Sequence, residues 1–168
     1  MGGHALAGIT NPDKVDLVCE AGAEAVIDLA ADNLHDTLRD QVFAITDGRG
    51  ADVVIDPLGD KIFDAALRAV AWRGRMVVIG FAAGRIPSIK ANYLLVKNID
   101  VGGLQISDYR RRRPDLTAKC FAEIFSLYEA NEVSALPTAT YPIEDFYTAL
   151  QNVQKRNVRG RIVLTQGG

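Results

Sequence analysis

Two short apolar runs constrain the fold of this 168-residue chain more than any other feature. The first is ADVVIDPLG at residues 51–59, and the second is GRMVVIGF at residues 74–81. Each is an unbroken run of strand length that ends in a turn, which is typical of a strand covered on both faces within a parallel sheet. Between the runs, apolar residues recur at helical spacing, namely Ile62, Phe63, Ala66, Leu67 and Val70. The pattern predicts a strand–helix–strand unit with a right-handed crossover.

The rest of the chain predicts regular alternation of strands and helices as far as about residue 106. Strands are expected at 4–9, 24–28, 52–56, 75–80 and 99–105, and helices near 12–21, 33–46, 60–71 and 91–97. The helix at 33–46 has one apolar stripe, formed by Leu34, Leu38, Val42 and Ile45. Beyond this region, helices at 115–130 and 143–155 flank a short extended piece, and a strand at 159–165 closes the chain. The helix at 143–155 is expected to expose an apolar stripe of Ile143, Phe146, Leu150 and Val153. The alternation is typical of an α/β fold with a parallel sheet.

Composition places the chain among ordinary globular proteins. Hydrophobic residues make up 48% of it and charged residues 24%, as in soluble domains. The net charge of −2 gives no support to a nucleic-acid or membrane partner. No apolar stretch has the length of a membrane span, and the first residues do not resemble a signal peptide. Cys19 and Cys120 each fall on an apolar helical face, so we expect them buried and reduced in a cytoplasmic protein.

Seven segments form a pattern that covers nearly the whole chain. They are NPDKVDL (11–17), EAGAEAVID (20–28), TDGRGADVVIDPLG (46–59), WRGRMVVIGFAAG (72–84), IPSIKANYLLVKN (86–98), YPIED (141–145) and GRIVLT (160–165). In order and spacing they resemble the carboxyl half of the medium-chain dehydrogenase/reductase superfamily, and most closely its zinc-independent NADPH:quinone oxidoreductase branch.

The resemblance implies an incomplete Rossmann-type sheet. Full members of that family are about twice as long and carry an amino-terminal β-rich catalytic domain. Their dinucleotide-binding domain opens with a strand and a glycine-rich turn, whereas no Gly-x-Gly-x-x-Gly turn precedes the first strand here. We therefore expect residues 1–130 to be a truncated dinucleotide-binding domain that lacks its first strand. Residues 131–168 are expected to form a helix–strand extension that would pack on the missing catalytic domain.

A missing first strand has a physical consequence for the sheet. In the strand order 3-2-1-4-5-6 the first strand is central, so the strands at 4–9 and 52–56 would flank a gap. Each buried unpaired amide costs about 1–3 kcal/mol. The gap could close by direct pairing of the two strands, by a segment of a second copy, or by a separate polypeptide that carries the missing half. We expect a homo-oligomer or such a partner.

The turn after the first strand suggests the adenosine side of a cofactor site. Sheets that bind NAD usually place an acidic residue there, which accepts hydrogen bonds from the ribose 2′-hydroxyl. Here the turn holds Thr10 and Asn11, and Lys14 follows one helical turn later. A neutral turn with a cation suits a 2′-phosphate, which favours NADP(H). The alternative is a helix capped by Asn11 with Lys14 in solvent.

The nicotinamide side is expected at the ends of the next two strands, because ligands of such sheets bind at their carboxyl edge. Pro57 and Leu58 follow one strand, and Phe81 and Ala82 follow the next. Alternatively, residues 56–59 form only a strand-to-helix turn shaped by their own polar groups, and Phe81 is a core residue.

Metal or covalent chemistry has little support in the sequence. His4 and His35 have no cysteine or carboxylate partners at ligand spacing, so we expect no metal site and identify no catalytic residue. His4 is expected at a strand end and His35 on the surface of a helix. The basic run at 110–113 is expected to be a solvated loop, with a phosphate or nucleic-acid contact as a weaker alternative.

The leading functional hypothesis is the nucleotide-binding half of an NADPH-dependent oxidoreductase. In the family that it resembles, hydride passes from NADPH to a quinone or an enone-like small-molecule acceptor. Without the glycine-rich turn, which supplies pyrophosphate-binding amides, the isolated chain should bind NADP(H) weakly or not at all and should not turn over. The alternative is a non-catalytic α/β interaction module or remnant that self-associates or docks with a partner domain.

Overall fold

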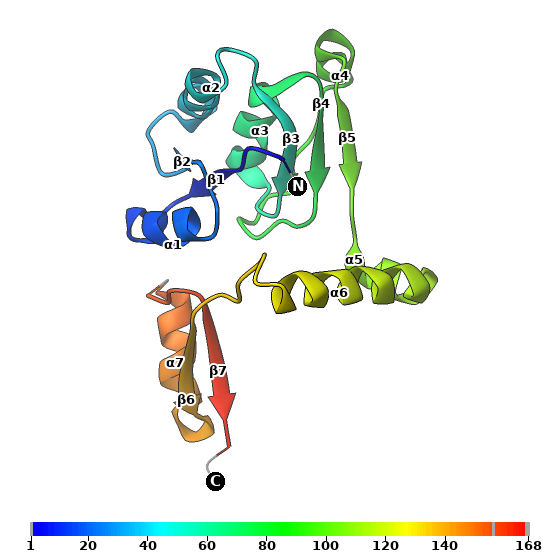
Figure 1. Cartoon of the computed structure of the whole chain (residues 1–168). Coiled ribbons are helices and arrows are strands. Elements are labelled where there is room, and N and C mark those ends of the chain that lie inside the picture. The colour runs from blue at the N-terminus through cyan, green and yellow to red at the C-terminus, as the bar shows by residue number, and fades with distance from the viewer. Residues whose placement is uncertain (1, 156, 167–168) are drawn as a thin grey trace. The chain divides into compact units, whose positions relative to one another are not determined.

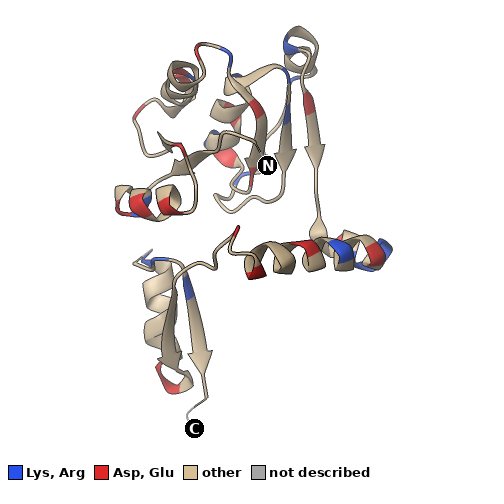
Figure 2. Ribbon diagram, viewed as in Figure 1, with Lys and Arg blue, Asp and Glu red and all other residues tan. Residues whose placement is uncertain are grey.

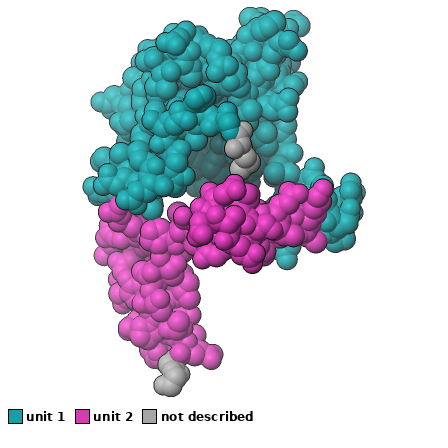
Figure 3. Space-filling view, viewed as in Figure 1, with its two compact units in different colours: residues 1–117 teal, residues 118–168 magenta. Residues whose placement is uncertain are grey.

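The computed structural model describes residues 2–155 and 157–166 and divides into two compact units, residues 1–117 and 118–168 (Figure 3). Strands and helices alternate in the first unit: β1 (Leu6–Ile9), a 3-10 turn (Pro12–Lys14), α1 (Val15–Glu20), β2 (Ala25–Asp28), α2 (Leu34–Ile45), β3 (Ala51–Asp56), α3 (Asp60–Ala69), β4 (Val70–Val78), α4 (Ala91–Lys97), β5 (Asp100–Gly103) and α5 (Ile106–Arg112) (Figure 1). Helix α6 (Pro114–Glu129) runs across the division. The second unit continues with β6 (Thr138–Pro142), a 3-10 turn (Ile143–Asp145), α7 (Phe146–Gln154) and β7 (Arg161–Thr165).

All the described strand pairs are parallel, which confirms the predicted α/β class. In the first unit, β1 pairs with β2, and a separate sheet has the order β3-β4-β5. Val54, Met76 and Val101 lie in register across that three-stranded sheet. The crossover from β3 to β4 through α3 is the strand–helix–strand unit that the two apolar runs predict.

The core lies on one face of the three-stranded sheet, where α3 packs against β3 and β4 and is itself covered by α2, which also contacts β2 (Figure 1). Buried side chains from both helices and from β4 fill it, among them Leu38, Val42, Phe63 and Met76. Three of the four residues predicted for the apolar stripe of α2 are buried, and the fourth, Ile45, is 43% exposed.

The opposite face of β3 is open to solvent. Val53 and Ile55 alternate with Val54 along the strand, so they point away from the core. They are 56% and 65% exposed, which is unusual for aliphatic residues in a strand of a parallel sheet. Covering both side chains would contribute about 1.5–3 kcal/mol each.

Strands β1 and β3 each have one edge without a partner strand in the described part of the chain. β1 and β3 therefore do not pair with each other, so the structure does not close the gap by direct pairing, which was one of the three possibilities. Since β1 ends one sheet and β3 ends the other, both edges present backbone groups that a further strand could bond.

Several local expectations need correction. The basic run is the end of helix α5 rather than a loop (Figure 2). Its arginines are exposed, as expected, and Arg111 and Arg112 pair with Asp108 on the same helix. Both cysteines are free and exposed, not buried. No residue of α1 is buried, and on α6 only Thr117 is. These helices have apolar stripes, as the sequence indicates, but little in the described structure covers them.

The second unit is a small parallel β–α–β motif. Strands β6 and β7 pair in register from Thr138↔Arg161 to Pro142↔Thr165, with α7 between them in sequence. The predicted apolar stripe of α7 is exposed, at Ile143, Phe146, Leu150 and Val153. The division at residue 130 and the role of residues 131–168 stay predictions, because a compact unit does not reveal what it packs against. Within the described residues, no helix has both the length and the apolarity to cross a membrane.

Candidate functional site

The turn after β3 is built around a buried carboxylate. Asp56 is 3% exposed, and its Oδ1 accepts hydrogen bonds from the amides of Leu58 at 2.9 Å and Gly59 at 3.0 Å. This Asx-type turn holds the chain as it leaves the strand and enters α3. Residues 56–59 therefore form the strand-to-helix turn, shaped by its own polar groups, that was the structural alternative for this segment. The turn leaves Pro57 exposed and Leu58 half-buried at the carboxyl end of the strand.

A second loop, at the carboxyl end of β4, is fastened to this turn by backbone hydrogen bonds. The Ala82 amide donates to the Pro57 carbonyl at 3.1 Å, and the Ala83 amide donates to the Leu58 carbonyl at 2.9 Å. The structure therefore brings together Pro57, Leu58, Phe81 and Ala82, the four residues predicted for the nicotinamide side. Their contact with a cofactor stays a prediction.

Two glycines allow the loops to approach this closely. Gly59 has φ +70°, and a Cβ there would lie 3.0 Å from Cδ1 of Phe81. A Cβ at Gly80 would lie 3.1 Å from the Pro57 carbonyl oxygen. The Phe81 ring is 42% exposed, so it is not a core residue. The result is an apolar ledge of two loops on which a flat ring could lie.

An arginine that the sequence analysis did not single out reinforces the ledge. The Arg85 carbonyl accepts from the Asp60 amide at 3.0 Å, and its guanidinium pairs with Asp60 at 3.0 Å and also with Asp64. The hydrogen bond to Asp60, followed by that to Asp64, raises the pKa of Arg85. The only signals in the sequence were a basic residue just after the stretch 80–84 and two acidic residues, Asp60 and Asp64, spaced one helical turn apart.

The turn after β1 has a simpler geometry. Asn11 is the N-cap, and its Oδ1 accepts from the Asp13 amide at 2.9 Å. Thr10 is exposed and Lys14 is half-buried. The capping role predicted as the alternative is confirmed for Asn11. A grip on a 2′-phosphate by Thr10, Asn11 and Lys14 stays a prediction, and these residues follow a strand that shares no hydrogen bonds with β3.

The two histidines lie as the sequence indicates. His4 is exposed just before β1 and pairs with Glu24 at 2.7 Å, and His35 is exposed on α2. Among residues 2–155 and 157–166, no group of three or more His, Cys, Asp or Glu could hold a metal ion. The described donor atoms therefore do not form a metal centre.

Comparison of the chain with known proteins identifies its class. The family model described as "Zinc-binding dehydrogenase" matches residues 1–123, and the chain belongs to this family. Within it, the chain is similar to the carboxyl half of quinone oxidoreductase-like proteins, which confirms the resemblance drawn from the sequence. The family description mentions zinc, but the donor set described above does not fit it, and we derive no step through a metal.

Curated relatives include the "Quinone oxidoreductase-like protein 2 homolog" of Nematostella vectensis, 29% identical over 163 residues. The match covers 96% of this chain and 44% of that relative. "Quinone oxidoreductase-like protein 2" of Mus musculus is 29% identical over 160 residues, covering 95% of this chain and 45% of the relative. The chain thus spans less than half the length of the curated relatives that it matches.

Solved structures agree on the fold. The quinone oxidoreductase of Pseudomonas syringae superposes with a TM-score of 0.81 at 22% identity, over 97% of this chain and 49% of that one. The Escherichia coli quinone oxidoreductase complexed with NADPH gives 0.80 at 24% identity, over 97% and 49%. These values establish the Rossmann-like half as the architecture of this chain.

Proposed function

We propose that this chain is the nucleotide-binding half of an NADPH-dependent oxidoreductase that reduces a quinone or an enone-like small molecule. The observation that carries the proposal is the ledge formed by Pro57, Leu58, Phe81 and Ala82 at the carboxyl edge of the sheet. Ligands of open α/β sheets bind outside this edge. The curated relatives named above are quinone oxidoreductase-like proteins, and the structurally similar Escherichia coli quinone oxidoreductase was solved with NADPH.

Each part of the chain has a role in this proposal. NADPH, when bound, supplies the hydride and its electron pair. The exposed Phe81 and the small Ala82 would support one face of the nicotinamide, and Pro57 and Leu58 would border it. The half-buried ammonium of Lys14, beside the neutral Thr10, would attract a 2′-phosphate rather than a free 2′-hydroxyl.

The same proposal explains the open strand edges. A parallel strand inserted between β1 and β3 would use the free edge of each and join the two sheets of the first unit into one. A helix following that strand could cover Val53 and Ile55. We propose that this strand, its glycine-rich turn and the catalytic domain come from a complementary segment of another polypeptide, since a second copy of this sequence could supply a strand but not the turn. The exposed stripe of α7 is proposed to pack on that domain.

The experiment is an NADPH titration of the chain alone and after addition of a polypeptide that carries the missing strand, the glycine-rich turn and the catalytic domain. We expect no saturation at micromolar NADPH for the chain alone. Micromolar binding and quinone reduction are expected once the segment is present, with both weakened by Lys14→Gln. Tight binding by the chain alone would refute the need for a complementary segment. Binding of NADH as strong as that of NADPH would refute the role of Lys14.

A second candidate, a non-catalytic interaction module, is favoured by the exposed apolar side chains of β3 and α7. It predicts assembly without cofactor binding. Light scattering that shows a larger assembly, together with no NADPH binding in any assembly, would select it over the reductase.

The free thiols of Cys19 and Cys120 accord with the proposed cytoplasmic location.

A further inference from the structure

A hollow of about 360 Å³ lies between helices α2, α3 and α4 of the first unit. Helix α3 ends just before β4 begins, and α4 ends shortly before β5 begins. The hollow therefore lies toward the amino ends of these strands, at the opposite edge from the loops that carry the ledge. It is separate from the proposed cofactor site.

Three cations border this hollow, and none of the described residues lining it is a carboxylate. They are Arg39 from α2, Arg68 from α3 and Lys97 from α4. The remaining wall is formed by Phe43, Asn92, Tyr93 and Val96. Cations from three different elements thus converge on one space, and their mutual repulsion is relieved by an anion.

Lys97 is held in place by the end of α3. Its Nζ donates to the carbonyls of Leu67 at 3.2 Å and Arg68 at 2.7 Å, where the helix dipole favours a positive charge. An ammonium has three donors, so this arrangement leaves one for a ligand. Burial, and then the positive charges of Arg39 and Arg68, lower the pKa of Lys97.

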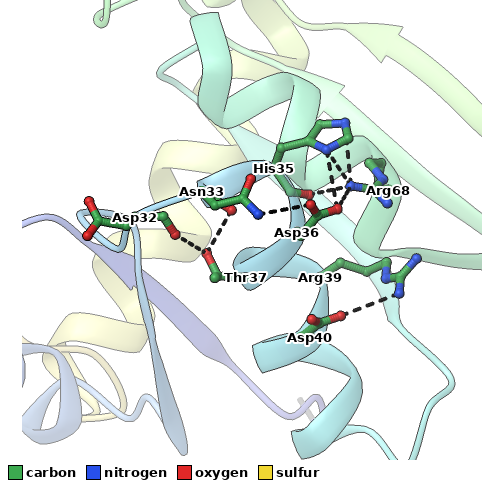
Figure 4. A network of polar contacts seen from close by, with 8 residues as sticks. All are labelled: Asp32, Asn33, His35, Asp36, Thr37, Arg39, Asp40 and Arg68. Atoms are coloured by element: carbon green, nitrogen blue, oxygen red, sulfur yellow. Dashed lines mark hydrogen bonds and ion pairs between the residues drawn. The ribbon is translucent and has the colours of Figure 1, made fainter.

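Arg68 and Arg39 differ in the hydrogen bonds and ion pairs that they already make. Arg68 donates to the His35 carbonyl at 2.7 Å and pairs with Asp36, as Figure 4 shows. Arg39 makes a longer ion pair, with 3.4 Å between its guanidinium and a carboxylate oxygen of its neighbour Asp40. Its guanidinium stacks over Phe43 at 5.4 Å, and its Nε is buried with no hydrogen-bond partner among the described residues. Figure 4 places both arginines on the same side of α2.

We propose that this hollow binds a phosphate group. Guanidinium groups match the geometry of phosphate oxygens. Asp36 and Asp40 already pair with Arg68 and Arg39, so the donors left for a phosphate are the remaining guanidinium N–H groups and one N–H of Lys97. The phosphate could be free inorganic phosphate or the phosphate of an aromatic ester, whose ring would lie against Phe43 and Tyr93. Neither source involves the cofactor loops.

The test is isothermal titration of the full chain, at constant ionic strength, with inorganic phosphate and separately with phenyl phosphate. Arg39→Gln is the test variant, because Arg68 and Lys97 also hold the helices together. Arg49→Gln is the matched control, since Arg49 is 64% exposed and pairs with Asp52 outside the hollow. Lys14→Gln separates this site from the proposed 2′-phosphate site.

We expect saturable binding that weakens about tenfold in Arg39→Gln and changes less than about twofold in the Arg49 and Lys14 variants. Asn92→Asp, which adds a negative charge to the wall, should also weaken it and provides a second test if the Arg39 variant misfolds. Tighter binding of phenyl phosphate identifies the ester as the better ligand, and equal binding identifies the free ion. Absence of saturable binding, or equal binding by the Arg39 and Arg49 variants, would overturn the proposal.

Discussion

The turn that follows β3 depends on Asp56, and its removal should cost far more than removal of an ordinary surface carboxylate. The carboxylate accepts two backbone hydrogen bonds, at 2.9 and 3.0 Å, while itself only 3% exposed. Hydrogen bonds to a charged group contribute about 1.5–3 kcal/mol each. The Gly59 amide is buried and would lose its partner, whereas water can reach the half-buried Leu58. We therefore expect Asp56→Ala to lower the free energy of unfolding by about 2–4 kcal/mol.

The assay is urea denaturation followed by circular dichroism, with two comparison variants. Asp56→Asn keeps an acceptor of the same shape without the charge, so it should lower the free energy of unfolding by about half as much as Asp56→Ala. Asp52→Ala removes an exposed partner of Arg49, an ion pair of 2.8 Å, and should cost less than about 1 kcal/mol. If Asp56→Ala costs no more than Asp52→Ala, the turn is not held by its carboxylate and the derived geometry of the ledge is wrong.

Three further predictions concern other parts of the chain. The hydrogen bond from Arg68 lowers the pKa of Asp36 from 3.8 to about 2, so its contribution to stability is present above pH 4 and lost as the pH falls toward 2. The stability difference between the native chain and Asp36→Asn should therefore shrink over that range in acid titrations of unfolding, and a constant difference would contradict it. Gly50→Ala should destabilise the chain more than Gly22→Ala in thermal melts, because both have positive φ but only the Gly50 Cβ would lie 2.6 Å from a carbonyl oxygen, that of Ala69; equal losses would count against this packing. Gly160→Ala should be worse still for the pairing of β6 with β7, since its Cβ would clash even more closely with the Pro137 carbonyl oxygen, and an unchanged melting temperature would refute that contact.

Local sequence signals predicted most of the elements. The apolar runs at 51–59 and 74–81 identified β3 and β4, and the spacing of Leu34, Leu38 and Val42 identified α2 with its buried face. These signals are strong because the residues concerned are buried by neighbours close in sequence. The proximity of the loops that carry Pro57 and Leu58, and Phe81 and Ala82, could also be predicted, since the carboxyl ends of adjacent parallel strands meet at one edge of the sheet.

The errors arose where burial depends on more distant structure. Cys19 and Cys120 lie on apolar helical stripes, and periodicity alone predicts that such residues are buried. Both are exposed because little in the described structure covers α1 or α6. Helix α5 was missed because consecutive arginines suggest a solvated loop, whereas ion pairs from Asp108 to Arg111 and Arg112 support a helix. The hollow beside Lys97 could not be predicted, because its cations come from three separate helices.

The most direct test of the account is amide hydrogen exchange at β1 and β3, measured with and without the complementary segment. The amides of these strands that do not bond to β2 or β4 should exchange rapidly in the chain alone. When the segment binds, protection should appear at both edges together, because one inserted strand bonds to both. Protection at both edges in the monomeric chain alone, or protection that appears at neither edge when the segment restores NADPH binding, would contradict the account.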